Sequence, residues 1–203
     1  MRLHWSPRSP FVRKVMIAAH ELGLADRIET VRTVVQMTRP NLALLPDNPL
    51  GKIPTLVLQD GTAIFDSLTI CEYLDALAGP LLFPAAGPAR WQALTWHALG
   101  HGLMDLGVLW RNERDKPEAR QTPDWLDSFA VKAGATLDAL EERAPHLAAT
   151  PYGIGHVAIG VALGYLDFRF GTLAWCHGRP GLAAWQAGFD ARPAVRATAV
   201  ADD

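Results

Sequence analysis

Residues 48–54 (NPLGKIP) combine turn-forming residues with a proline that should begin a strand. Proline has no N–H to donate to a sheet ladder, so Pro54 is expected at the first residue of a strand. If the Ile53–Pro54 bond is cis, the backbone N–H and C=O of Ile53 turn outward and can pair with an extended peptide ligand. The alternative is an ordinary loop proline with a trans bond, the commoner form.

Asp66 and Ser67 stand at the expected start of a helix. A helix N-terminus offers free N–H groups and a positive partial charge, so it can bind a carboxylate, to which the Ser67 hydroxyl could also donate. The Asp66 carboxylate could bind an ammonium group, and the two residues together would fit the head group of an amino acid. Simple N-capping is the alternative, because these residue types dominate N-cap positions.

Ser9 precedes Pro10 at the start of another expected helix. Its hydroxyl could donate a hydrogen bond to a bound thiolate, and the positive end of the helix would favour the anion. N-capping is again the alternative, and the two roles compete for one hydroxyl. The two cysteines, Cys71 and Cys176, lie far from Ser9 in the sequence, so no Cys-x-x-Cys redox pair is expected there.

His97, His101 and Asp105 recur at every fourth residue and therefore share one face of a helix. Such spacing can hold a metal ion, but two histidines four residues apart do not specify a metal site without a placed third ligand. We interpret them as a polar stripe and expect no metal cofactor. Cys71 lies within an apolar helix and is interpreted as a core residue rather than a nucleophile.

The elements that must position these residues alternate between strand and helix periods over residues 1–78. The pattern predicts strands at 1–5 and 28–35, a hairpin of strands 55–58 and 62–65, helices at 10–22 and 66–77, and a loop with a short irregular helix at 36–52. The order βαβαββα predicts an α/β domain built on a mixed four-stranded sheet.

Residues 79–88 contain three prolines and two glycines and are interpreted as a linker. Helical periodicity follows over residues 89–203. Residues 154–170 are apolar on nearly every side, which is typical of a helix buried at the centre of a bundle. The sequence therefore predicts an all-helical second domain at 89–203.

Three segments together resemble the glutathione S-transferases, specifically a bacterial branch: residues 6–15 (SPRSPFVRKV), 48–55 (NPLGKIPT) and 65–68 (FDSL). Further matches are residues 102–105 (GLMD) and residues 164–168 (GYLDF), which are followed by Trp-Cys at 175–176. The resemblance covers nearly the whole chain. It implies a thioredoxin-like domain at 1–78, an all-α helical bundle domain at 89–203, and a homodimer.

The same resemblance implies how the site binds glutathione, the expected co-substrate. Ile53 pairs with the cysteinyl backbone of glutathione, and Pro54 is cis. Asp66 and Ser67 hold the γ-glutamyl group, while Lys52 lies near the glycyl end.

By its position, the resemblance implies that Ser9 is the catalytic residue, which donates a hydrogen bond to the thiolate. Many bacterial members carry a tyrosine in the first strand, where this chain has Trp5, and an indole N–H cannot replace a phenol in the same place. The resemblance implies a transferase that conjugates glutathione to a small electrophile, as in detoxification. The alternatives are a non-catalytic binding or regulatory protein of the same fold and a glutathione-dependent peroxidase or isomerase.

One departure concerns the buried helix. In the family it usually begins with the capping box Ser/Thr-x-x-Asp, whereas residues 153–156 here read GIGH. This predicts a cap that is weaker by about 1 kcal/mol or less.

Composition narrows the classes of function. The 203 residues are 49% apolar and 20% charged, a globular balance that argues against disorder. Nineteen basic and 21 acidic side chains give a net charge of −2, so no nucleic-acid partner is expected. The longest apolar stretch, about ten residues, is short of the roughly 20 that cross a membrane, and no signal-peptide pattern opens the sequence. We expect a cytoplasmic protein without a membrane partner.

Overall fold

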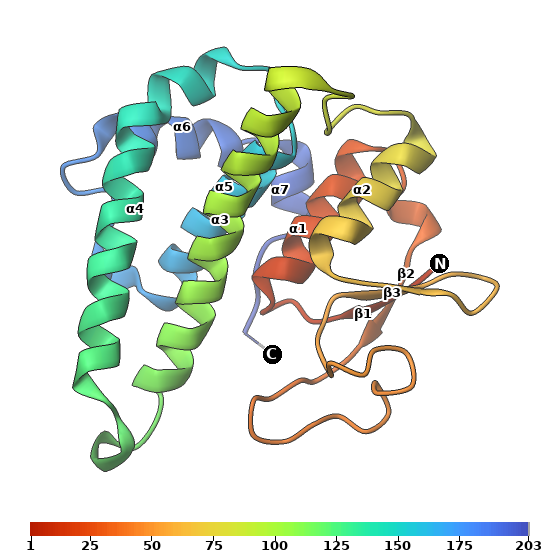
Figure 1. The fold of residues 1–203 in the computed structure, drawn as a ribbon, viewed down its shortest axis with the longest axis horizontal. Coiled ribbons are helices and arrows are strands. Elements are labelled where there is room, and N and C mark those ends of the chain that lie inside the picture. The colour runs from red at the N-terminus through yellow and green to blue at the C-terminus, as the bar shows by residue number, and fades with distance from the viewer. Residues whose placement is uncertain (203) are drawn as a thin grey trace. The chain divides into compact units, whose positions relative to one another are not determined.

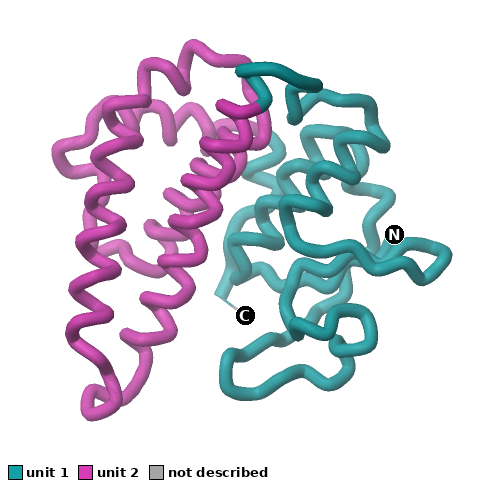
Figure 2. Tube along the Cα trace, in the orientation of Figure 1, with its two compact units in different colours: residues 1–90, 193–203 teal, residues 91–192 magenta. Residues whose placement is uncertain are grey.

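The computed structural model describes residues 1–202, which form two compact units (Figure 2). Residues 1–90 and 193–202 form the first unit, and residues 91–192 form the second. The sequence-based division placed residues 89–203 together, whereas the last residues group with the first unit. The physical reason is that helix α7 (Pro193–Ala197) packs on helix α1 (Pro10–Glu21), where Arg13 Nη2 donates to the backbone oxygen of Val195 at 3.4 Å.

A four-stranded mixed sheet forms the centre of the first unit, as predicted. Its strands are β1 (Arg2–Trp5), β2 (Glu29–Arg32), β3 (Thr55–Val57) and β4 (Ala63–Ile64), in the spatial order β2-β1-β3-β4. β1 runs parallel to β2 and antiparallel to β3, and β3 runs antiparallel to β4. Leu3 in β1 and Leu56 in β3 are fully buried and face each other in the register.

Helices α1 and α2 (Ser67–Ala78) pack together on one side of the strands (Figure 1). Ser9 is the N-cap of α1 and Pro10 its first residue, as predicted, and Gly23 follows the helix with a φ of 66°, a conformation that favours glycine. The apolar face of α1 is buried: Val12, Val15, Ile17, Ala18 and Ala19.

The segment between β2 and β3 lies on the opposite side of the strands from these helices (Figure 1). The loop predicted at 36–52 is present, but the short irregular helix expected within it is wrong, because the segment is a succession of turns. Pro40, Pro46 and Pro49 remove backbone donors that a helix would need. The Asn41 side chain accepts from the Ala43 N–H at 3.1 Å and so favours a local turn instead.

The second unit is helical. Its helices are α3 (Gly87–Arg114), which begins in the first unit, α4 (Pro123–Ala149), α5 (Ile154–Arg169) and α6 (Pro180–Asp190). Residues 154–163 of α5 are all buried, which confirms the prediction of a central buried helix. Within residues 1–202, no helix combines the length and the apolar character needed to cross a membrane.

Candidate functional site

The sheet register gathers three of the predicted site segments at one end of the first unit's sheet. The antiparallel pairing of β1 with β3 matches His4 with Thr55, so the end of β1 lies beside the start of β3. The antiparallel pairing of β3 with β4 brings the end of β4 to the same place. The loop to Ser9 follows β1, residues 53–54 precede β3, and residues 66–67 follow β4. Residues that are far apart in the sequence therefore meet at one edge.

The turn before β3 presents unpaired backbone groups. The Ile53–Pro54 peptide bond is cis, as the resemblance implied. The Ile53 side chain is buried, yet among residues 1–202 neither its backbone N–H nor its C=O has a hydrogen-bond partner. A backbone N–H and C=O without partners beside the start of a strand are the groups with which an extended peptide ligand could pair. Lys52, one residue earlier, is exposed beside it.

Asn48 holds this turn in shape through its buried side chain. Its Nδ2 donates to the Lys52 backbone oxygen at 3.0 Å and to Thr55 Oγ1 at 2.9 Å, and its Oδ1 accepts from the Leu50 N–H at 3.0 Å. Sequence reasoning treated Asn48 only as part of a motif. The signal available in the sequence was the position of Asn48 at the start of the NPLGKIP stretch, six residues before Pro54.

The start of α2 contains a capping side chain and, next to it, a buried hydroxyl without a hydrogen-bond partner. Asp66 is the N-cap, and its Oδ1 accepts from the N–H groups of Leu68 at 2.9 Å and Thr69 at 3.4 Å. Ser67 is 1% exposed, and its Oγ has no hydrogen-bond partner among residues 1–202. A buried hydroxyl without a partner is costly, so a ligand group that bonds to Ser67 would stabilise the site.

Ser9 also caps its helix, because its Oγ accepts from the Val12 N–H at 3.3 Å. Capping uses an oxygen lone pair and leaves the hydroxyl hydrogen available, so the predicted competition between the two roles does not follow. The hydroxyl can accept from the helix and donate to an anion at the same time. Ser9 is partly exposed, at the positive end of α1.

Comparison with known proteins decides the family. The family model described as glutathione S-transferase, N-terminal domain, matches residues 8–77, and the model for the C-terminal domain matches residues 123–186. The chain belongs to the glutathione S-transferase family. An uncharacterized GST-like protein of Escherichia coli strain K12, YibF, is 34% identical over 185 residues, which cover 90% of each chain.

Two crystal structures of a glutathione transferase family member from Pseudomonas fluorescens Pf-5 are similar to this chain. The first contains bound glutathione; it is 40% identical, covers 99% of each chain and has a TM-score of 0.94. The second contains bound S-(propanoic acid)-glutathione; it is 38% identical, covers 100% of each chain and has a TM-score of 0.89. These matches confirm the predicted fold class, a thioredoxin-like domain followed by a helical domain.

In this glutathione S-transferase family member, a polar network that sequence reasoning missed ties β1 to the site turn. His4 is buried, with Nε2 at 2.8 Å from Asp47 Oδ2 and Nδ1 at 2.9 Å from Thr33 Oγ1. Asp47 also pairs with Arg2 at 3.2 Å. Since Asp47 directly precedes Asn48, the network anchors the segment that leads to the site. The sequence offered one signal for this network: a histidine within a strand, whose ring nitrogens need hydrogen-bond partners when the strand is buried.

The remaining candidates lie outside this edge. Cys71 is fully buried, and burial raises the pKa of its thiol to about 12, so it is a protonated core residue, as predicted. His97 is buried, and His101 Nε2 lies 3.5 Å from Asp105 Oδ2. Within the part of the chain that the structure describes, no three His, Cys, Asp or Glu side chains gather as they would around a metal ion.

Proposed function

We propose that this chain is a glutathione transferase, which binds glutathione, stabilises its thiolate and conjugates it to a small electrophile. The observation that carries the proposal is the unpaired backbone of Ile53 beside cis Pro54, at the same sheet end as the unpartnered Ser67 hydroxyl. Glutathione is an extended peptide whose γ-glutamyl end has the carboxylate and ammonium of an amino acid. The bound glutathione and its S-substituted form in the Pseudomonas structures support this assignment.

The proposed binding roles follow from the local geometry. The Ile53 backbone N–H and C=O pair with the cysteinyl residue of glutathione as an added strand. Ser67 and the N-terminus of α2 bind the γ-glutamyl carboxylate, and Asp66 binds its ammonium group. Lys52, exposed beside Ile53, faces the negative charge of the glycyl end.

Ser9 is the proposed catalytic residue. An ordinary thiol has a pKa near 8.5, so only a few per cent is ionised at neutral pH. Donation from the Ser9 hydroxyl and the positive end of α1 stabilise the thiolate and lower that pKa. The thiolate sulfur then forms a bond to the electrophilic carbon, whose leaving group departs with the electron pair of the broken bond.

We also propose that the protein is a cytoplasmic homodimer. Large apolar side chains lie exposed on the helices of the second unit, among them Trp91 on α3 and Trp125 and Val131 on α4. Large apolar side chains left exposed on these helices are candidates for an interface with a second copy of the chain. Both cysteines are free, as expected in a reducing compartment.

The experiment that tests the function combines glutathione titration with a conjugation assay on 1-chloro-2,4-dinitrobenzene and a panel of other electrophiles. We expect saturable glutathione binding and turnover of at least one electrophile. Binding without turnover of any electrophile would favour a non-catalytic binding protein of this fold. Absence of glutathione binding would overturn the proposal altogether.

A further inference from the structure

A buried histidine of β1 contacts two segments that are far from it in the sequence. His4 Nδ1 lies 2.9 Å from Thr33 Oγ1, just after β2, and His4 Nε2 lies 2.8 Å from Asp47 Oδ2, in the turns that precede β3. The exposed fraction of the His4 side chain is 9%, and that of the Asp47 side chain is 25%. Both ring nitrogens therefore have protein partners in a place that water hardly reaches.

The partners of His4 indicate how many hydrogens its ring carries. Thr33 Oγ1 donates to the Val31 backbone oxygen at 3.0 Å. Because a hydroxyl has a single hydrogen, the same oxygen accepts from His4 Nδ1. An ionised carboxylate such as that of Asp47 only accepts, so His4 Nε2 donates to it. A ring that donates from both nitrogens is an imidazolium, which carries a positive charge.

Asp47 pairs with two cations of β1 that differ in burial. Arg2 Nη2 lies 3.2 Å from the same oxygen that His4 contacts, but the Arg2 side chain is 49% exposed, so water weakens this pair. A third cation, Arg32, donates from Nη1 to the Thr33 backbone oxygen at 3.3 Å. In this group of charges Asp47 supplies the carboxylate. Since a buried charge is costly unless it is paired, the pair of Asp47 with His4 should matter more than its pair with Arg2.

Asp47 is followed in the chain by the residue that shapes the binding turn. The backbone N–H groups of Asp47 and Asn48 both donate to the Leu44 oxygen, at 3.0 Å and 2.9 Å, so one turn holds both residues. The Asn48 side chain then donates to the Lys52 backbone oxygen at 3.0 Å. A continuous series of contacts thus runs from His4 in the sheet to Lys52 in the binding turn.

We propose that His4 is a positioning residue for glutathione: its imidazolium pairs with Asp47 and so holds the turn whose Lys52 and Ile53 bind the ligand. The inference rests on the proposed function for the identity of the ligand, whereas the protonation of His4 does not. Ligand groups bind tightly only when the contacts behind them fix their geometry. Loss of the ion pair removes the anchor of this turn to β1.

The protonation of His4 can be tested without a substitution. Nuclear magnetic resonance of the protein with isotope-labelled histidines, at neutral pH, shows which ring nitrogens carry a hydrogen. The His4 signals are assigned by their contacts with Thr33. We expect two N–H signals from the His4 ring, both in the free protein and with glutathione bound. A single N–H signal, with the other nitrogen bare, would overturn the inference.

Substitutions test the link to the ligand, and the measured quantity is the glutathione Kd from calorimetry. His4→Gln should raise this Kd about tenfold, the scale of one hydrogen bond to a charged group. Asp47→Asn leaves the charge of His4 unpaired and should raise it by a similar factor. The double variant should bind no more weakly than either single variant, because both substitutions remove the same pair. Effects that multiply in the double variant would overturn the inference.

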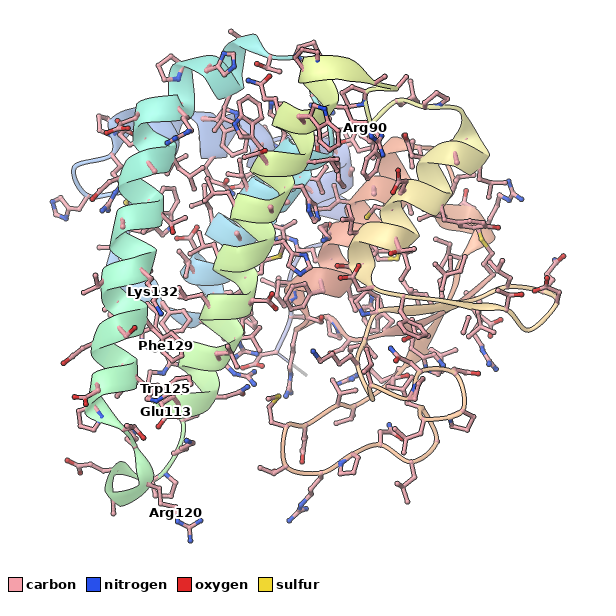
Figure 3. The ribbon with its side chains drawn as sticks, in the orientation of Figure 1. Arg90, Glu113, Arg120, Trp125, Phe129 and Lys132 are labelled. Atoms are coloured by element: carbon pink, nitrogen blue, oxygen red, sulfur yellow. The ribbon has the colours of Figure 1, made fainter. Side chains whose placement is uncertain are left out.

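Two further variants remove a positive charge and leave His4 in place. Arg2→Gln removes the exposed partner of Asp47 and should raise the Kd only about twofold. Arg120→Gln is the control for net charge and should leave the Kd unchanged. Figure 3 shows Arg120 at the turn between α3 and α4, pointing away from both helices. Circular dichroism checks the folding of every variant. An effect of Arg120→Gln as large as that of His4→Gln would overturn the inference.

A second ligand separates positioning of the turn from a general loss of structure. γ-Glutamylcysteine lacks the glycyl residue of glutathione, so its binding does not use the proposed contact with Lys52. In His4→Gln the Kd of glutathione should rise more than the Kd of γ-glutamylcysteine. A general loss of structure would raise both by the same factor, and that result would overturn the positioning role.

The same measurements separate this inference from the proposed function. A protein that binds no glutathione but shows two N–H signals from His4 would reject the proposed function and support the ion pair. A protein that binds glutathione with a Kd that His4→Gln does not change would reject this inference alone.

Discussion

Ser67 carries the sharpest residue-scale prediction, because its buried hydroxyl has no protein partner. Ser67→Ala should weaken glutathione binding by about 1–3 kcal/mol, the range for a hydrogen bond to a charged group. It should not lower the free energy of unfolding of the free protein, since no hydrogen bond within the protein is lost. Titration calorimetry and urea denaturation measure the two quantities. Unchanged affinity would show that Ser67 is not a ligand group.

Asp66 combines capping with the proposed recognition of an ammonium group, and two substitutions separate these roles. Asp66→Ala removes the cap and the charge, so it should lower stability by about 1 kcal/mol and glutathione affinity by about 1–3 kcal/mol. Asp66→Asn is the control, because asparagine caps a helix as well as aspartate does. It should keep the stability and still lose affinity. Full affinity in Asp66→Asn would mean that Asp66 only caps α2.

At this scale, the sequence predicted which residue types could bind and where helices begin, because capping signals are local. It could not predict the side-chain network of His4, Asp47 and Thr33, since those contacts join residues that only the folded chain brings together. It also could not show that the Ser67 hydroxyl is left unpartnered, because burial depends on tertiary packing.

At the scale of elements, two glycines of α3 differ sharply in their surroundings. A Cβ added at Gly100 would lie 2.5 Å from backbone atoms of α5, whereas a Cβ added at Gly102 would meet nothing within 4 Å. Gly100→Ala should therefore lower the free energy of unfolding by about 1–3 kcal/mol through overpacking. Gly102→Ala, the matched control in the same helix, should raise it by about 0.5–1 kcal/mol through helix propensity. Equal stabilities in urea denaturation would contradict the close packing of α3 on α5.

The start of α5 gives a pH-dependent prediction. His156 Nδ1 accepts from the Gly153 N–H at 3.1 Å, and Nε2 lies 3.1 Å from the Leu147 backbone oxygen, to which it donates. The imidazole thus supplies the part of the capping box that aspartate has in the family pattern. Burial lowers the pKa of His156, and a nearby arginine lowers it further, so the folded protein holds the ring neutral.

Below about pH 6.5 the unfolded chain binds a proton at this histidine before the folded protein does. The stabilising contribution of His156 is therefore complete above that pH and is lost as the pH falls toward the lower folded pKa. We expect the free energy of unfolding to decrease over this range, and to decrease less in His156→Asn, whose amide oxygen can still accept from Gly153. Urea denaturation above and below pH 6.5 provides the comparison. A variant with the same pH dependence as the wild type would show that His156 does not contribute to it.

Helices and strands were predictable where the hydrophobic periodicity and the capping residues indicate the same element. Helix α1 has a Ser-Pro start and a glycine just beyond its end, and α5 is apolar on every side, so both appear in the structure as predicted. The segment 36–52 was predictable as a loop from its turn-forming residues, but the short helix expected within it is not formed. The three prolines and the turn held by the Asn41 side chain prevent it.

For the whole molecule, the proposed homodimer predicts a sedimentation mass of twice the 22.1 kDa of the chain at micromolar concentration. The reason is that large apolar side chains of α4 are exposed, Trp125 at 55% and Val131 at 72%. Val131→Glu should shift the protein toward the monomer if this surface forms the interface. A wild-type mass near that of one chain would contradict the dimer.

Helix α7 groups with the first unit, and no local sequence pattern predicts this grouping. Helix α7 is short, and the contact of Arg13 with the Val195 backbone joins residues at opposite ends of the chain. Sequence periodicity predicts that such a segment is helical, but not which partner it packs on.

The proposed function is tested most directly by the ultraviolet absorbance of the thiolate in the glutathione complex, titrated from about pH 5 to about pH 10. The wild-type midpoint should lie roughly one to two pH units below that of free glutathione, because the Ser9 hydroxyl and the end of α1 stabilise the anion. Ser9→Ala should move the midpoint back toward the free value and lower conjugation more than it lowers glutathione affinity. A wild-type midpoint equal to that of free glutathione would contradict thiolate stabilisation, and equal midpoints in wild type and variant, with a lower melting temperature in the variant, would reduce Ser9 to a helix cap.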